Sequence, residues 1–538
     1  MSTGRKILLL LLPFVLAVAL RIYPYLLTGA PWGIDSWTLM RNSNLLLSNS
    51  PTQLIGNPIF EGYNICWPAV SIFGSVASLV YGVSPLRLMP ILIPLVGSIT
   101  TFFLFVVVKK LTGNFLLASL AATLFAAASF DTIFTASVTK ETFALPLFMV
   151  GILLLLRKGN LPNLFVFSLV SLGLIMSHYA LAFILFILAA EISIIPLLMR
   201  TRGEMVQLEK LLYPTIMGVV GLAYYFIYLK ASLVGISFSL GDSLSLFAFI
   251  SLVAGFQIFF QPRPGKKIPS TAWAIPVVAL ALALGLLLAG TKTSILPLAP
   301  ILTSNLVLDI APYLAVGVIA AVGYVVMLKQ SENRSLTILL LWLGVPSALL
   351  GFSLFAASSG IGIVYRLFTF LYMPVGVFAA FALIKFINGG SKARHAAKTS
   401  LIVAFLVMIV FALFFQSYAA VVENNNILGG GEWGFKPSDV SAASWVNATL
   451  PSNTTISGDS KTYGVFSYFG LKTNVDFGYA YLTGTETWNG EPLLTYSLMS
   501  QNGYDLNLYG EPLPANWSTN LSNDLSLVYS NGNDQLWL

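Results

Sequence analysis

Charged residues are scarce in this chain. Only 9% of its 538 residues are Asp, Glu, Lys or Arg, and 57% are apolar, whereas about a quarter of an average soluble domain is charged. This imbalance excludes a soluble globular protein, a disordered chain and a collagen-like fibre. The apolar residues gather in long runs, so we expect the bilayer to be the solvent of most of the chain.

Cysteine and histidine are nearly absent. The single cysteine, Cys66, excludes an internal disulfide framework and a cysteine-rich zinc site. The two histidines, His178 and His395, exclude a metal centre built from several histidines without carboxylate partners. Any metal site in this chain must therefore rely on Asp and Glu.

Charges of the two signs are divided unequally along the sequence. Residues 1–421 contain 25 basic and 10 acidic residues, whereas residues 422–538 contain three basic and 11 acidic ones. Neither part has a basic stripe interleaved with aromatic residues, so we expect no nucleic-acid binding. The division predicts a multi-span membrane domain over 1–421 and a soluble extracytoplasmic domain over 422–538.

The apolar runs predict a polytopic α-helical membrane protein. A membrane helix needs about 20 apolar residues, which gives about 13 transmembrane helices here. The expected spans are 7–27, 88–108, 114–131, 143–156, 161–177, 180–199, 211–229, 243–261, 271–289, 311–328, 336–356, 367–386 and 400–421. The run 67–82 is shorter and starts with Trp67-Pro68, so it predicts an interfacial or re-entrant helix.

Basic residues predict the orientation of these spans. If the N-terminus is cytoplasmic, the inner loops hold 18 basic residues, with at least two in each loop. An odd number of spans then places the C-terminal domain outside. The pattern of 422–538 predicts a mixed α/β fold for that domain, and the whole chain is expected to be a multi-pass protein of the cell membrane.

Acidic residues of the membrane domain gather on the predicted outer side. Six of the ten lie in outer loops: Asp35, Glu61, Asp131, Glu141, Asp242 and Asp309. Acids at an interface can bind a divalent metal ion such as Mg²⁺ or Mn²⁺, deprotonate an acceptor, or simply face water. Trp32 and Trp37 flank Asp35, and we expect them to anchor it at headgroup depth.

Basic and aromatic residues near the outer face are candidates for substrate binding. Arg21 lies in the first apolar run, where an arginine needs a partner, either Asp35 or a lipid phosphate, unless it snorkels to the headgroups. Lys140 could bind phosphate or act as an interface anchor. His178 and Tyr179 could bind phosphate or sugar, although a structural hydrogen bond explains a lone histidine equally simply.

The order of these features resembles a known superfamily. An intramembrane Arg, an Asp in the first outer loop, a Trp-Pro helix ending in YGVSPLRLMP and a span ending in KKLTGN follow one another. This order resembles the GT-C superfamily of membrane glycosyltransferases, which use polyprenyl-phosphate-linked sugars. Thirteen spans with an outer C-terminal domain are most similar to oligosaccharyltransferase catalytic subunits of archaeal type, and protein O-mannosyltransferases and aminoarabinose transferases are related.

The resemblance implies roles for individual residues. Asp35 matches the first-loop acid that serves as catalytic base or metal ligand, and Glu61 resembles a second first-loop acid. Arg366, in VYRLFTFLYMP, resembles an arginine that contacts the phosphate of the donor. Further metal ligands implied by the resemblance are Asp131 and Glu141, in SFDTIFTASVTKETFALPLF, and Asp309.

One motif departs from the oligosaccharyltransferases. Their W-W-D-Y-G signature reads the acceptor sequon, and SGDSKTYG stands in its place here, so that only Tyr463-Gly464 remain. This departure favours an acceptor other than Asn-x-Ser/Thr.

The sequence therefore predicts an integral-membrane glycosyltransferase. It would move a sugar or oligosaccharide from a polyprenyl-(di)phosphate donor, such as dolichyl phosphate, to a protein or glycan acceptor at the outer face. Two other classes remain open. A secondary transporter would place its ionisable residues near the midplane, often in repeated halves. A structural or assembly membrane protein with an outer interaction domain would not need an acid-rich outer face.

Overall fold

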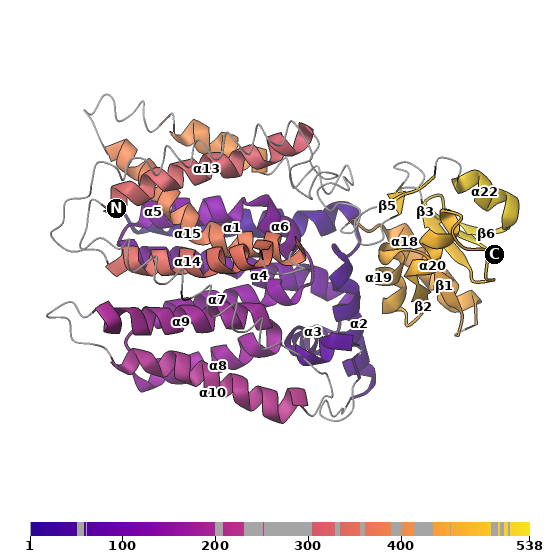
Figure 1. Ribbon diagram of the computed structural model, residues 1–538, viewed down its shortest axis with the longest axis horizontal. Helices are drawn as coiled ribbons and strands as arrows, with labels where there is room; N and C mark the ends of the chain where they lie inside the picture. Colours follow the sequence, from indigo (N-terminus) through magenta and orange to yellow (C-terminus); the bar gives the residue numbers. More distant parts are fainter. Residues whose placement is uncertain are drawn as a thin grey trace. The chain divides into compact units, whose positions relative to one another are not determined.

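The computed structural model is mostly helical, with short helices and strands near the C-terminus (Figure 1). It describes residues 2–50, 59–60, 62–199, 208–230, 251, 304–328, 334–355, 361–388, 400, 402–413, 434–451, 453–496, 504–505, 511–514 and 517–538. By its internal contacts the chain divides into two compact units. Unit 1 comprises Met1–Leu20, Val96–Thr132 and Ala144–Ser417, and unit 2 comprises Arg21–Leu95, Ile133–Phe143 and Tyr418–Leu538.

Long apolar helices make up the described part of unit 1 (Figure 1). They are the start of α1 (Thr3–Thr28), most of α4 (Pro85–Thr112), α5 (Phe115–Ala126), most of α6 (Ser129–Thr135) and of α7 (Lys140–Leu155), α8 (Leu161–Ser177), α9 (Tyr179–Met199), η2 (Leu208–Leu211), α10 (Leu212–Tyr224), η3 (Tyr225–Leu229), α13 (Ser304–Leu328), α14 (Arg334–Phe355) and α15 (Ile361–Asn388). Leu, Ala, Val and Phe fill the core between them. Gly323 of α13 lies against Phe378 of α15, where a Cβ would stand 1.9 Å from the Phe378 carbonyl oxygen. Glycine at this position allows the two helices to approach closely, as small residues do in membrane bundles.

Five of the described helical segments are long and apolar enough to cross a membrane. They are Thr3–Thr28, Pro85–Thr112, Glu209–Leu229, Ala311–Leu328 and Leu367–Asn388. Several predicted spans correspond to shorter apolar helices, and the predicted spans 243–261 and 271–289 lie outside the described residues except for residue 251. The chain thus has several membrane-spanning helices, and the count of 13 stays a prediction.

One predicted span is wrong. Residues 114–131 are two helices, because α5 ends at Ala126 and α6 begins at Ser129. The Thr132 hydroxyl donates to the carbonyl oxygens of Ala126, at 3.2 Å, and Ala128, at 2.8 Å. The bond to Ala126 gives a partner to a carbonyl group at the end of α5, where the helix stops, whereas the Ala128 carbonyl also accepts from the Thr132 amide at 2.9 Å.

The N-terminal part of unit 2 contains two packed helices, α2 (Ile34–Ser48) and α3 (Ala69–Tyr81), joined through η1 (Gly62–Cys66). Serines fasten α2 to α3: Ser43 Oγ donates to the Ser71 carbonyl at 3.0 Å, and Ser75 Oγ donates to the Ser43 carbonyl at 2.9 Å. The 13 residues of α3 extend about 20 Å, less than the roughly 30 Å hydrocarbon core. The segment was predicted to form a helix too short to span.

The C-terminal part of unit 2 is built around a five-stranded sheet (Figure 1). Its strand order is β2-β1-β3-β7-β6, from β1 (Thr455–Ser457), β2 (Lys472–Asn474), β3 (Leu493–Tyr496), β6 (Leu527–Ser530) and β7 (Asp534–Trp537). Strand β1 pairs in parallel with β2 and β3, whereas β7 pairs antiparallel with β3 and β6. The remaining elements are α18 (Pro437–Thr449), α19 (Ser460–Tyr468), α20 (Val475–Leu482), β4 (Tyr504–Asp505), β5 (Glu511–Pro512) and α22 (Trp517–Asp524).

Candidate active site

Arg21, near the end of α1, is buried and hydrogen-bonded. Only 1% of its side chain is exposed, and its Nε donates to Thr135 Oγ1 at 2.7 Å. A buried guanidinium is stable only when its charge and its donors are matched by the surrounding protein. The bond joins two positions 114 residues apart and connects the end of α1 to the end of α6.

Two further hydrogen bonds join the start of α2 to α6 and the residues that follow it, and a third holds Ser36 in place. The Trp32 indole Nε1 donates to the Ile133 carbonyl at 3.0 Å. The Ser36 hydroxyl donates to the Trp32 carbonyl at 2.5 Å and accepts from the Val138 amide at 2.8 Å. The two segments predicted as the first and second outer loops are therefore held as one body within unit 2.

Asp35 occupies the first turn of α2, directly before Ser36. The turn is formed by Gly33, whose φ of 80° places it in the left-handed region that favours glycine. The Asp35 side chain is half-buried, and among the residues that the structure describes it has no hydrogen bond or ion pair. A carboxylate on a fixed backbone is thus left available to a ligand.

Lys140 begins α7, in the segment that carries Val138. Its ammonium lies over the Trp67 ring, 5.1 Å from the centroid. Burial raises the pKa of the nearby Cys66 thiol, and the charge of Lys140 opposes this rise. The next residue, Glu141, is only 2% exposed. Unit 2 thus contains four of the predicted site residues: Arg21, Asp35, Lys140 and Glu141.

The SGDSKTYG stretch packs directly against the helix that carries Asp35. Its residues form the start of α19, which lies on α2 within unit 2. A Cβ on Gly464 would stand 2.9 Å from Ile34 Cγ1 and 3.4 Å from Trp37 Cδ1. The Trp37 ring in turn meets Phe435 edge-on, with centroids 5.2 Å apart. Gly464 allows this close approach because it has no side chain.

The predicted membrane anchoring by Trp32 and Trp37 is wrong. The two side chains are 1% and 0% exposed. Trp32 packs with Tyr23, Ile133 and Ala136, and Trp37 belongs to the apolar core that α2 shares with the C-terminal part of unit 2. Both rings fix α2 inside the protein, and neither faces lipid.

The other predicted residues that the structure describes belong to unit 1. Asp131 lies in α6 and is completely buried. Arg366 lies in α15. Asp309 was expected in an outer loop, but the structure places it within α13, because the apolar helix begins earlier than predicted, at Ser304. Glu61 lies outside the described residues.

His178 and Tyr179 join α8 to α9 in unit 1. His178 is 9% exposed, and its Nδ1 accepts from the Leu181 amide at 3.4 Å, near the start of α9. The two rings stack with centroids 5.7 Å apart, and Tyr179 is 53% exposed. The structural role that the sequence allowed for His178 is therefore present, and Tyr179 remains accessible.

The proposed metal ligands do not form a cluster in the described part of the chain. Asp35 and Glu141 belong to unit 2, whereas Asp131 and Asp309 belong to unit 1. Among the described residues, no three His, Cys, Asp or Glu side chains lie close enough to hold a metal ion together. The residues described do not fit a resident metal ion, so the chemistry below is derived from protein groups alone.

Sequence reasoning missed several residues that build this site. Ser36, Thr135 and Gly464 are small or neutral, and nothing in their local sequence distinguishes them from similar residues elsewhere. Their roles depend on contacts between segments more than 100 residues apart, such as that between Ser36 and Val138. Ser36 is the only one of them with a sequence signal, because it lies directly beside Asp35.

Comparison with known proteins identifies the fold. No protein-family model and no curated protein sequence matches the chain. The crystal structure of the Archaeoglobus fulgidus oligosaccharyltransferase in the apo form matches with a TM-score of 0.59 and 14% sequence identity, over 93% of this chain and 70% of that chain. This chain has the fold of an archaeal oligosaccharyltransferase. The predicted resemblance to GT-C glycosyltransferases is thereby confirmed for the fold.

Two structures of ArnT from Cupriavidus metallidurans match more distantly. The apo state gives a TM-score of 0.40 at 10% identity, over 99% of this chain and 98% of that chain. The form bound to undecaprenyl phosphate gives a TM-score of 0.39 at 12% identity, over 100% of this chain and 98% of that chain.

Proposed function

We propose that the chain is an integral-membrane glycosyltransferase. It transfers a sugar or an oligosaccharide from a polyprenyl-(di)phosphate donor to an acceptor at the outer face of the cell membrane. The observation that carries this proposal is the junction of two loop segments in unit 2, which holds Asp35 half-buried on a fixed helix end and is also bonded by the buried Arg21. The oligosaccharyltransferase-like fold supports the same class.

Asp35 is the group best suited to activate the acceptor. An acceptor hydroxyl becomes a nucleophile when a carboxylate takes its proton, and such base catalysis contributes about 10²–10⁴-fold to the rate. The Asp35 backbone is fixed by Gly33, Ser36 and the packing of Trp37. Attack at the anomeric carbon, in line with the departing phosphate, inverts that carbon.

Cationic side chains are suited to bind the departing lipid phosphate, because neutralising its negative charge makes it a better leaving group. Lys140 is on the segment joined to α2, and its stacking on Trp67 fixes its stem. Arg21 supports the junction through Thr135. We assign phosphate contacts also to Arg366 of α15, and contacts to sugar or phosphate to the accessible Tyr179 and its neighbour His178. Glu61 is assigned the role of a second acid.

The acceptor differs from that of the oligosaccharyltransferases. Within SGDSKTYG, Asp459 is completely buried. It accepts from the Thr462 amide at 2.9 Å and from the Thr462 hydroxyl at 3.1 Å, and the Tyr496 hydroxyl also donates to it. An acid used in this way caps α19 and cannot contact an incoming peptide. This supports another protein or a glycan as the acceptor.

The proposal includes the orientation predicted from the sequence. The N-terminus is cytoplasmic, residues 1–421 form the membrane domain, and residues 422–538 form an extracytoplasmic domain. The basic residues of the predicted inner loops support this arrangement.

A strain that lacks the chain tests this function. Mass spectrometry of its glycans should show an unused lipid-linked sugar accumulating while one class of glycan on protein or surface polymer disappears. Reintroducing the chain should restore the missing glycan, and reintroducing Asp35→Ala should not. Normal glycans in the deletion strain, together with altered solute uptake, would support a transporter instead.

A further inference from the structure

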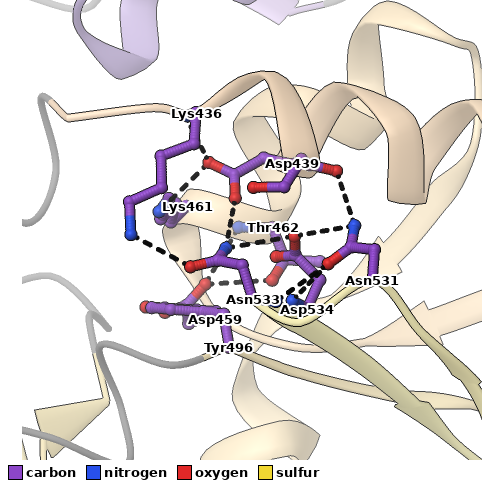
Figure 2. Close-up of polar contacts among 10 residues, drawn as sticks. Lys436, Asp439, Asp459, Lys461, Thr462, Tyr496, Asn531, Asn533 and Asp534 are labelled. Carbon is purple, nitrogen blue, oxygen red and sulfur yellow. Dashed lines mark hydrogen bonds and ion pairs between the residues drawn. The ribbon is translucent and has the colours of Figure 1, made fainter. Parts of the chain in front are cut away.

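Three ionisable side chains are buried together in the C-terminal part of unit 2 (Figure 2). Asp439 of α18, Lys461 of α19 and Asp534 at the start of β7 are 5%, 4% and 1% exposed. They come from three elements that are distant in the sequence. Burying an ionisable side chain costs several kcal/mol unless charged or hydrogen-bonding partners replace its lost hydration. The partners of these three side chains are therefore the question.

Asp439 and Lys461 are in direct contact. The Lys461 ammonium nitrogen lies 3.1 Å from Asp439 Oδ2. This contact places the amine beside the carboxyl group, and the proposed reaction needs the nitrogen to move closer to the carboxyl carbon, because reacting atoms in near-attack geometries are about 3–3.5 Å apart. Attack by the nitrogen on the carboxyl group first requires an ammonium proton to leave, and this contact offers a direct path for it to the carboxylate.

Further donors hold the Asp439 carboxyl in place. The Lys436 amide donates to Oδ2 at 2.9 Å, and the Asn533 Nδ2 donates to Oδ1 at 3.0 Å (Figure 2). Donors aimed at a carboxyl oxygen polarise the group and stabilise the oxyanion that forms when a nucleophile attacks. The Asn533 amide is suited to this role, because it contacts the oxygen that Lys461 does not.

Asp534 lies beside this pair and is suited to carry protons. Burial raises its pKa to about 7, and the charge of Asp439 and a hydrogen bond between the two carboxyl groups add to the rise. The Asn533 Nδ2 contacts both acids, since it also lies 3.1 Å from Asp534 Oδ2. A group that gains and loses a proton near neutral pH is an efficient proton carrier.

The surroundings exclude bulk water. The Lys461 ammonium lies over the rings of Tyr496, at 4.6 Å, and Phe435, at 5.6 Å. Asp439, Lys461 and Asp534 line one small cavity with Thr462, Tyr496 and apolar side chains, and this cavity has room for about one water molecule. A condensation that releases one water is favoured where little water is present to reverse it.

We propose that Lys461 and Asp439 condense to form an intramolecular amide bond between α18 and α19. The Lys461 nitrogen bonds to the Asp439 carboxyl carbon, and the bond from that carbon to Oδ2 breaks. Two protons of the ammonium group reach Oδ2, with Asp534 as their carrier, and Oδ2 leaves as water. Oδ1 becomes the carbonyl oxygen of the amide and keeps its bond to Asn533. No oxidant, reductant or further reactant is consumed.

The amide bond has a consequence for the fold. It replaces a buried ion pair, whose desolvation is costly, with a neutral group. It also links α18 covalently to α19, the helix that packs on α2. The chain between Asp439 and Lys461 then forms a closed covalent loop. This inference is independent of the proposed function, because it concerns a cluster that contains none of the assigned glycosyltransferase residues.

Peptide mass spectrometry of the full-length chain tests the bond. Chymotrypsin cleaves after Phe435, Trp445 and Tyr463, so the amide would join peptide 436–445 to peptide 446–463. We expect this branched pair, with a mass one water below the sum of the two peptides. A bacterial host that lacks N-glycosylation leaves Asn447 and Asn453 unmodified and keeps the masses simple. Two separate peptides with an unmodified Lys461 would overturn the proposal.

Two variants assign the roles. Lys461→Arg keeps the buried cation but cannot form the amide under these conditions, so its peptides should separate. Asp534→Asn keeps the shape and removes the proton carrier, so the branched pair should fall at least tenfold in samples of equal age. Circular dichroism should show both variants folded. An undiminished branched pair in Asp534→Asn would remove Asp534 from the reaction.

Discussion

Two acidic residues of unit 2 each lie in the first turn of a helix and have opposite surroundings. Asp439 in α18 is buried, and its oxygens contact Lys461, Asn533 and the amide of its own N-cap residue, Lys436. Asp35 in α2 is half-buried, follows a glycine that offers no side-chain cap, and has no bond among the described residues.

The comparison separates a structural carboxylate from a functional one. Both benefit from the positive end of a helix dipole, so position in a helix does not distinguish them. They differ in whether the carboxylate oxygens are already used in hydrogen bonds and ion pairs within the fold. The protein fixes the backbone of Asp35 with the bonds of Ser36 but leaves its carboxylate for a ligand.

Replacing each of these acids by alanine should give opposite results. Asp35→Ala should lower the rate of sugar transfer about 10²–10⁴-fold with an almost unchanged melting temperature, because Asp35 makes no hydrogen bond or ion pair among the described residues. Asp439→Ala should destabilise the chain by about 3–5 kcal/mol, because it removes the link to Lys461 and leaves that ammonium group buried without a partner carboxyl group. Transfer from a lipid-linked donor in proteoliposomes and thermal unfolding measure the two effects. Equal losses of stability in both variants would contradict the distinction.

The stability of the buried cluster should also respond to pH. The raised pKa of Asp534, about 7 against 3.8 for an ordinary aspartate, means that the folded state holds a proton which the unfolded state releases. Its contribution to stability is complete below pH 3.8 and is lost as the pH rises through 7. The upper limit of this change is roughly 4 kcal/mol.

The pH effect is best measured in Lys461→Arg, which keeps Asp439 charged. Unfolding free energies of this variant should fall between pH 4 and pH 8. Adding Asp534→Asn should flatten the profile, since an amide does not titrate in this range. A slope that survives the second substitution would assign the titration to another group.

The contact of α19 with α2 should be sensitive to bulk at Gly464. Gly464→Val places atoms where Ile34 and Trp37 already stand, and overpacking of this kind costs about 1–3 kcal/mol. The shift of α2 should also reduce transfer activity, because Asp35 lies on that helix. Gly317→Val is the matched control, since this helical glycine of α13 has no atom within 4 Å of an added Cβ. Similar losses in the two variants would show a general cost of valine in a helix.

Features encoded locally could be predicted from the sequence, whereas pairings between distant segments could not. Hydropathy predicted a first span over 7–27, and α1 runs from Thr3 to Thr28. The partner of Arg21 was expected to be an acid or a phosphate, but one partner is the neutral Thr135, 114 residues away. No local pattern marks a threonine for this role.

The two tryptophans illustrate the same limit. An aromatic pair beside an acid near a membrane span is typical of interfacial anchors, and this interpretation of Trp32 and Trp37 was wrong. Their burial depends on α19 and on the segment after α6, which reach α2 only in the folded chain. The fold class is therefore easier to predict than the environment of any one side chain.

The smallest expected effect tests whether Lys140 belongs with Asp35 as a group open to ligands. Lys140→Met should raise the KM for the lipid-linked donor about tenfold, as expected when one charged hydrogen bond to phosphate is lost, while Lys140→Arg should retain most of the affinity. Lys385→Met is the matched control, because Lys385 also lies over an aromatic ring, 5.7 Å from the centroid of Phe381, and is assigned no contact with the donor. If both methionine variants bind the donor normally, Lys140 stacks on Trp67 and does not contact the donor. Asp35 is then the only one of these two residues that is available to a ligand.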